Sequence, residues 1–265
     1  MDAFMSRLAR EDAVLVTVVA AQGSVPRDPG AWMAVFAGDV AGTIGGGRLE
    51  HMAIAEARRR LAGPAAGATE QRFALGPSLG QCCGGVVRLQ FERVGAADAA
   101  ALRQRLAPRL APVALFGGGH VGSALVQALA PLPFALAWID SRDEIFPPEL
   151  PANVRCEHSD PVQAAVPQLA AGTSVVIMSF SHAEDLDVVA ACLVRQRALG
   201  DLAFIGLIGS KTKWATFRHR LEQRGFGAAE LAQVTCPIGL PGIAGKEPAV
   251  IGASVAAQLL QRRRP

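Results

Sequence analysis

Tyrosine is absent from the 265 residues of this chain. Its absence excludes mechanisms that use a phenol as general acid, such as the Tyr and Lys pair of short-chain dehydrogenases. The five cysteines are an odd number without CxxC spacing, so neither a disulfide framework nor a structural zinc site is predicted, and we expect a reducing, cytoplasmic location. Charged residues make up only 18% of the chain and the net charge is +3. This charge is too mild and dispersed for a nucleic-acid-binding surface.

Apolar segments suited to a membrane are also lacking. Residues 110–139 contain no Asp, Glu, Lys or Arg, but glycines and prolines interrupt this stretch, and a lipid-exposed helix would not tolerate them without help from neighbouring groups. Near the N-terminus, Glu11 and Asp12 directly precede the apolar run 13–21, which argues against a signal peptide. We therefore expect no membrane partner, and the hydrophobic content of 51% predicts a globular fold.

The first part of the chain has the pattern of a small α+β domain. Four β-rich segments are expected at residues 13–19, 32–36, 69–75 and 85–91. A helix is expected over residues 49–61, where Gly63-Pro64 ends it. A segment rich in Ala, Arg and Leu then predicts a linker helix, which is a plausible hinge between two domains. The predicted organisation is an N-terminal domain over 1–95, a linker helix over 96–111 and a C-terminal domain over 112–265.

The C-terminal part has the pattern of a Rossmann-like, doubly wound parallel sheet. A strand over 113–116, a helix over 121–129 and a strand over 134–139 form a βαβ unit. Further strands at 174–179 and 203–208 alternate with helices near 183–197, 211–223 and 248–261. The predicted fold class is therefore α/β, with a small α+β domain followed by a Rossmann-like domain.

The glycine motif Gly117-Gly118-Gly119-His120-Val121-Gly122 is a GxGxxG sequence between a predicted strand and a predicted helix. This context is the one that a dinucleotide fingerprint requires. The glycines permit a tight turn, and the N-terminus of the following helix offers free N–H groups to a phosphate. Asp140, which ends the next strand, could accept a hydrogen bond from a ribose hydroxyl. Close packing of strand on helix is the alternative explanation of this motif.

A second glycine loop, Gly45-Gly46-Gly47, runs directly into the first predicted helix and is a possible anion cradle. Three consecutive glycines cost conformational entropy, although a tight connection packed against the sheet would also explain them. In the same domain, Ser24 and Arg27 place a hydroxyl and a permanently charged guanidinium on a loop stiffened by Pro26. Arg27 could pair with a phosphate.

The loop Gly80-Gln81-Cys82-Cys83-Gly84 places two adjacent cysteines between glycines. A thiolate is a soft ligand that suits a soft metal centre or sulfur transfer, whereas a buried and inert thiol is the alternative. Adjacent residues of an extended segment point to opposite faces. We therefore expect one cysteine, Cys82, to face a site and Cys83 to face the core.

Taken together, these motifs resemble those of the XdhC family, the xanthine dehydrogenase accessory proteins related to CoxI. The motifs are GSVPRDPGA at 23–31, GTIGGGRLEH at 42–51, LGQCCGG at 79–85 and LFGGGHVG at 115–122. The resemblance continues through FIGLIGSKTK at 204–213 and CPIGLPGIAGKEP at 236–248, and so covers nearly the whole chain in the expected order.

The resemblance implies a chaperone, not an enzyme, that binds the molybdenum cofactor and protects it while a cysteine desulfurase replaces an oxo ligand by sulfur. The chaperone would then deliver the cofactor to the molybdenum subunit of apo xanthine dehydrogenase, and a homodimer is expected. In this picture Arg27 and the Gly45–Gly47 turn contact phosphate or pterin, and Cys82 lies near the molybdenum or the transferable sulfur. The candidate cofactor-binding residues are Ser24, Arg27, Gly45, Gly46, Gly47, Gln81, Cys82, Gly117, Gly119, His120, Gly122 and Asp140.

The Rossmann fingerprint leaves other functions open, because plain molybdopterin contains no nucleotide. The fold either shapes the cleft or binds a nucleotide that regulates handover. For a nucleotide, Asp140 favours an unphosphorylated ribose, whereas Arg142 would tolerate a 2′-phosphate. An NAD(P)-dependent oxidoreductase is the main alternative, but no pairing of a histidine with a carboxylate stands out for it beyond the cluster around His182. A structural adaptor that joins desulfurase and dehydrogenase without holding cofactor is the third possibility.

Overall fold

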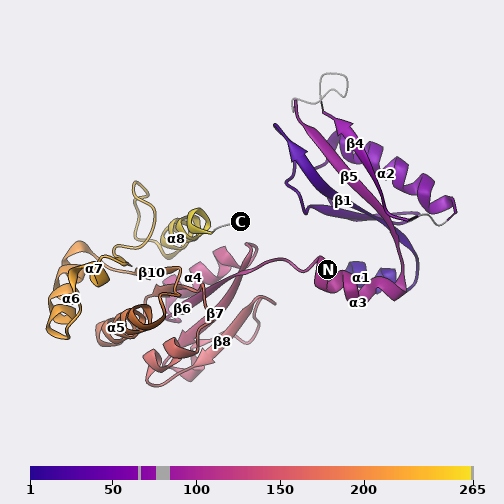
Figure 1. The fold of residues 1–265 in the computed structure, drawn as a ribbon. Coiled ribbons are helices and arrows are strands. Elements are labelled where there is room, and N and C mark those ends of the chain that lie inside the picture. The colour runs from indigo at the N-terminus through magenta and orange to yellow at the C-terminus, as the bar shows by residue number, and fades with distance from the viewer. Residues whose placement is uncertain (65–66, 76–83, 264–265) are drawn as a thin grey trace. The chain divides into compact units, whose positions relative to one another are not determined.

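The computed structural model describes residues 1–64, 67–75 and 84–263 (Figure 1). The chain divides into two compact units, Met1–Ala107 (unit 1) and Pro108–Pro265 (unit 2), and each is described by itself. The fold class is confirmed, because unit 1 contains an antiparallel sheet and unit 2 a parallel one. No helix in the described ranges is both long and apolar enough to cross a bilayer.

Unit 1 is a five-stranded antiparallel sheet with the strand order β3-β2-β1-β5-β4. The strands are β1 (Ala13–Gln22), β2 (Trp32–Val35), β3 (Val40–Gly42), β4 (Thr69–Ala74) and β5 (Val86–Val94). Alternate residues of β1 enter two different cores. Val14 and Val16 pack with residues of helix α2 (Gly47–Ala62), whereas Leu15 packs with residues of the helices α1 (Asp2–Leu8) and α3 (Ala99–Arg105).

The segment predicted as a linker helix is part of unit 1 in the structure. It contains a short 3-10 helix, Ala96–Asp98, followed by α3, and unit 1 extends to Ala107. Leu102 of α3 is buried against Phe4 and Leu8 of α1. Burial of this apolar side chain anchors α3 to the first unit, so the boundary between the units falls after the helix.

Unit 2 is a six-stranded parallel sheet with the order β11-β10-β9-β6-β7-β8 and helices on both faces. Its strands are β6 (Ala111–Phe116), β7 (Phe134–Asp140), β8 (Val154–His158), β9 (Ser174–Ile177), β10 (Phe204–Leu207) and β11 (Val234–Thr235). One face packs against α4 (His120–Leu129) and α8 (Pro248–Arg262). The other face packs against α5 (His182–Leu199), α6 (Lys211–Gln223), α7 (Ala228–Leu231) and the 3-10 helix η4 (Val162–Gln168).

The strand order of unit 2 is that of a Rossmann fold, in which the chain reverses direction across the sheet between its first and fourth strands. These strands are β6 and β9, which are hydrogen-bonded neighbours. In open α/β sheets, ligands bind outside the carboxyl ends of the strands at this switch point. In unit 2 the loops after β6, β7 and β9 therefore border the place where a ligand is expected.

Candidate functional site

Two predicted loops of unit 1 are in direct contact. Gly45 adopts a φ of +118°, and a Cβ atom placed on it would lie 2.5 Å from Cβ of Pro26 and 3.1 Å from Cγ of Arg27. No side chain fits in that space, and the positive φ is itself one that L-residues rarely adopt. The glycine at position 45 therefore allows the Gly45–Gly47 turn to approach the loop that carries Ser24 and Arg27.

The end of the cysteine loop reaches the same place. A Cβ atom on Gly85 would lie 2.5 Å from the backbone oxygens of both Gln22 and Ser24. The N–H of Leu75 donates to the carbonyl oxygen of Gly85 at 2.8 Å and joins the two ends of this loop. Gln81 and Cys82 lie outside the described residues. Their predicted roles stay predictions, but the chain re-enters the described structure beside the Ser24–Arg27 loop.

Glu50 on the first turns of α2 holds the glycine turn. Its carboxylate accepts hydrogen bonds from Oγ1 of Thr43 at 2.5 Å and from the backbone N–H groups of Ile44 and Gly46, each at 3.0 Å. Burial opposes its ionisation, but these hydrogen bonds outweigh burial and lower the pKa of Glu50. The N–H of Gly45 donates to Oγ1 of Thr43. The backbone N–H groups of Gly45 and Gly46 therefore already have acceptors within the chain, on Thr43 and Glu50.

The groups of this turn that remain available for a ligand are cationic or N–H donors. Among the described residues, the backbone N–H groups of Gly47 and Arg48 have no acceptor, and Arg27 and Arg48 are exposed and form no ion pair. Ser24 is exposed on the adjoining loop. A Cβ atom on Gly46 would meet nothing within 4 Å. Two guanidinium groups and free amides at a helix N-terminus suit a phosphate group.

Two of the three fingerprint glycines of unit 2, Gly117 and Gly122, are required by packing. A Cβ atom on Gly117, whose φ is +123°, would lie 2.0 Å from the carbonyl oxygen of Met178, and one on Gly122 would lie 2.1 Å from that of Gly117. Nε1 of Trp138 donates to the same Gly117 oxygen at 2.9 Å. In contrast, a Cβ atom on Gly119 would meet nothing within 4 Å. His120, the next residue, is exposed. Of the three motif glycines, only Gly119 faces open space.

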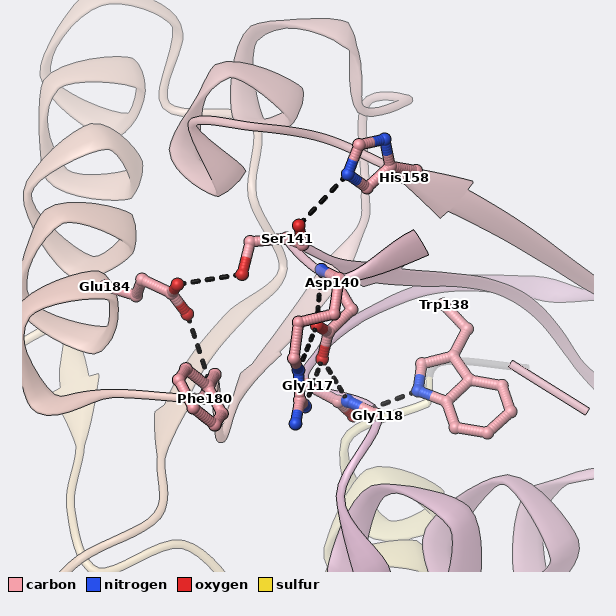
Figure 2. Close-up of polar contacts among 9 residues, drawn as sticks. Gly117, Gly118, Trp138, Asp140, Ser141, His158, Phe180 and Glu184 are labelled. Atoms are coloured by element: carbon pink, nitrogen blue, oxygen red, sulfur yellow. Dashed lines mark hydrogen bonds and ion pairs between the residues drawn. The ribbon is translucent and has the colours of Figure 1, made fainter. Parts of the chain in front are cut away.

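Asp140 is buried at the end of β7, and its carboxylate is fully engaged within the chain (Figure 2). Oδ1 accepts from the backbone N and from Nε of Arg142, each at 2.9 Å, and Oδ2 accepts from the N–H of Gly118 at 2.6 Å and from Nη2 of Arg142 at 2.9 Å. Burial opposes ionisation of Asp140, yet the bonds from Arg142 and Gly118 lower its pKa. A carboxylate has about four acceptor positions. A ribose hydroxyl would therefore bind Asp140 only if Arg142 moved away.

The sequence interpretation named Asp140 and Arg142 but missed two residues beside them, Ser141 and Phe180. The guanidinium carbon of Arg142 lies 4.4 Å from the centre of the Phe180 ring. Phe180 follows β9, and its backbone N–H donates to Glu184 of α5, which also accepts from Oγ of Ser141 (Figure 2). Their positions directly after buried strands of a doubly wound sheet were the available signal, because side chains at strand carboxyl ends line the crevice.

The structure thus distributes the candidate residues between two sites. Ser24, Arg27, Gly45, Gly46 and Gly47 gather in unit 1, and Gly117, Gly119, His120, Gly122 and Asp140 gather in unit 2. Each unit therefore holds one group of candidate ligand-binding residues, and the described residues contain no cluster of three or more metal-ligating side chains.

Matches to models of known protein families identify the family of the chain. Residues 113–259 match the XdhC Rossmann domain, and residues 6–73 match the XdhC and CoxI family. The chain belongs to the XdhC family, as its motifs predict.

Two individual proteins extend these matches. The uncharacterized protein YqeB of Escherichia coli (strain K12) is 28% identical over 250 residues, which are 93% of this chain but 43% of YqeB. The chain therefore spans less than half the length of YqeB. A crystal structure of a xanthine dehydrogenase from Bacillus halodurans superposes with a TM-score of 0.78 at 18% identity and covers 98% of this chain and 94% of that one. This likeness shows that the two proteins share a fold.

Proposed function

We propose that this chain is a maturation chaperone that binds the molybdenum cofactor and inserts it into the molybdenum subunit of apo xanthine dehydrogenase. Membership of the XdhC family and the structural likeness to a protein described as a xanthine dehydrogenase support an accessory role. The observation that carries the proposal is the meeting of the Ser24–Arg27 loop, the Gly45–Gly47 turn and Gly85 at one place in unit 1.

The chemistry of that place fits the cofactor as cargo. Molybdopterin carries a phosphomonoester, a hydrogen-bonding pterin and a dithiolene that holds the metal. In our proposal the guanidinium groups of Arg27 and Arg48 and the free N–H of Gly47 bind the phosphate. Cys82, three positions before Gly85 in the sequence, supplies a soft sulfur atom for the molybdenum or for the sulfur being transferred.

The role requires partners and the release of cargo. A cysteine desulfurase would act on the cofactor while it is held, and apo xanthine dehydrogenase would then receive it. The chain itself would catalyse no reaction and would act in the cytoplasm as a homodimer. The side chains of Arg27 and Arg48 are exposed. A competing site that makes more charge-assisted hydrogen bonds to the phosphate would therefore take the cofactor from them.

An NAD(P)-dependent oxidoreductase is the second candidate, and the Rossmann unit favours it. The acid expected to recognise the ribose, Asp140, already uses all its acceptor positions on Gly118 and Arg142. The chain also has no tyrosine, and this candidate leaves the loops of unit 1 without a task. We therefore place it second.

A transfer assay tests the proposal. The chain is purified without oxygen from a host that makes molybdopterin and is mixed with apo xanthine dehydrogenase, and the recovered xanthine oxidation is measured. We expect the wild-type chain and a Cys156→Ser control, whose thiol lies in β8 of unit 2, to restore activity. Cys82→Ser should restore much less. Equal recovery with both variants would remove Cys82 from the mechanism, and no recovery with the wild type would contradict delivery.

A further inference from the structure

Phe180 is one of the most exposed large apolar side chains of unit 2. Its relative exposure is 66%, and it belongs to neither hydrophobic core of the unit. Single exposed apolar residues are common on protein surfaces, and Leu199 at the end of α5 is equally exposed. Exposure by itself therefore says little, and the contacts that hold the ring decide its meaning.

The Phe180 ring is held on one side by a chain of contacts that ends in the protein interior. Arg142 stacks on one face of the ring at 4.4 Å, and two of its guanidinium nitrogens donate to buried Asp140 at 2.9 Å. Asp140 in turn accepts from the N–H of Gly118 at 2.6 Å. The backbone N–H of Phe180 donates to Glu184 at 3.1 Å (Figure 2). These contacts hold Phe180 beside Arg142, and the 66% exposure of the residue leaves much of its ring accessible to solvent.

The location of the ring points to a ligand. Phe180 lies two residues beyond Met178, whose carbonyl oxygen contacts Gly117 at the switch point between β6 and β9. Ligands of doubly wound sheets bind in this crevice. Aromatic side chains held with one free face at such sites act as stacking platforms for planar rings.

The charges around the ring narrow the class of ligand. The carboxylates of Asp140 and Glu184 share one nearby cation, the guanidinium group of Arg142. The charge of the nearby Asp185 is balanced by an ion pair with Lys213 at 2.5 Å. The immediate surroundings therefore carry more negative than positive charge. Such surroundings disfavour a phosphate group next to the Phe180 ring and favour an uncharged part of a ligand there.

We propose that Phe180 is a binding residue of unit 2 that stacks the planar nitrogen heterocycle of a ligand in the crevice beside Gly119. A pterin and a nucleobase share this chemistry. The inference is independent of the proposed role of unit 1, because it would hold for a nucleotide as well as for molybdopterin. If the heterocycle that stacks on Phe180 is a pterin, unit 2 contributes to binding of the cargo.

Direct binding measurements test the inference and distinguish the two sources. Pterin and adenosine monophosphate are titrated separately into the full chain, by pterin fluorescence and by equilibrium dialysis, respectively. We expect Phe180→Ala to weaken binding of one of them by about tenfold, since base stacking on an aromatic ring has effects of this size, and Phe180→Trp to restore it. The matched control Leu199→Ala removes an equally exposed side chain from α5 and should leave binding unchanged. Thermal melting confirms that each variant is folded.

The two probes give different answers about the source of the ring. Dependence of pterin binding on Phe180 assigns the crevice to the cargo, and dependence of nucleotide binding assigns it to a separate nucleotide. Equal affinities of Phe180→Ala and Leu199→Ala for both probes would overturn the inference. A wild-type chain that binds neither probe would also overturn the inference. So would a Phe180→Ala variant whose oligomeric state changes while its affinity for the probes does not.

Discussion

Replacing Gly117 by alanine is expected to destabilise unit 2 by more than about 4 kcal/mol, a loss that few single substitutions reach. The new Cβ would lie 2.0 Å from the carbonyl oxygen of Met178, at a residue whose φ is +123°. Both obstacles are backbone, so no side-chain rotation relieves them. The N–H of Met178 donates to the carbonyl oxygen of Phe116 at 2.8 Å, and moving Met178 would break the contact between β6 and β9.

Gly119→Ala is the matched control for this prediction. Gly119 lies in the same loop, has a φ of −68° and would place its Cβ in open space. We expect its free energy of unfolding to change by less than about 1 kcal/mol. Denaturant unfolding followed by tryptophan fluorescence measures both variants, because Trp138 contacts Gly117 directly. Equal stability of the two variants would show that the loop is not packed as described.

Arg27→Ala is expected to weaken retention of the cofactor by about 10-fold to 100-fold. A hydrogen bond to a charged group contributes about 1.5–3 kcal/mol, and about 1.4 kcal/mol corresponds to a factor of ten. Arg27 is exposed and its Cγ lies beside Gly45, so its removal should affect binding more than folding. Arg27→Lys should recover part of the loss, because lysine keeps the charge but lacks the planar fork that matches a phosphate.

The control for Arg27 is an arginine at the other end of the same strand. Arg10 is also exposed and precedes β1, whereas Arg27 follows it. Arg10→Ala removes the same charge from unit 1 and should leave retention unchanged. Pterin remaining after repeated gel filtration measures all three variants. Retention that falls equally in Arg10→Ala and Arg27→Ala would point to net charge and would contradict a specific contact.

The sequence predicts the local elements well where steric and capping rules act on neighbouring residues. The Gly117–Gly122 motif predicts a tight strand-to-helix turn because few other residues fit there, and the turn is found. Helix α6 occupies the predicted residues 211–223, where Oγ of Ser210 accepts from the N–H of Lys213 and caps the helix. The short strands β8 and β11, which lie at the two edges of the sheet, were missed because they offer too few buried positions for a periodic pattern.

The partners of individual side chains, whether near or distant in the sequence, are what the sequence could not supply. It predicts a linker helix over 96–111, but only the structure shows that Leu102 packs against Phe4 and Leu8. It predicts that the Asp140 carboxylate is available to a ribose hydroxyl, because no pattern of residues indicates that the Arg142 side chain turns back to this carboxylate. Likewise, the role of Glu50 depends on a turn whose amides point at it. The conformation of the folded chain decides such roles, and patterns of residue type do not record it.

The molybdenum and pterin content of the chain, purified without oxygen from a host that makes molybdopterin, tests the central claim most directly. Our account predicts near-stoichiometric pterin together with molybdenum, and a large loss of both in Arg27→Ala but not in Arg10→Ala. A chain that carries neither, and that instead holds NAD(P), would contradict the account. The function would then belong to the Rossmann unit and to an oxidoreductase.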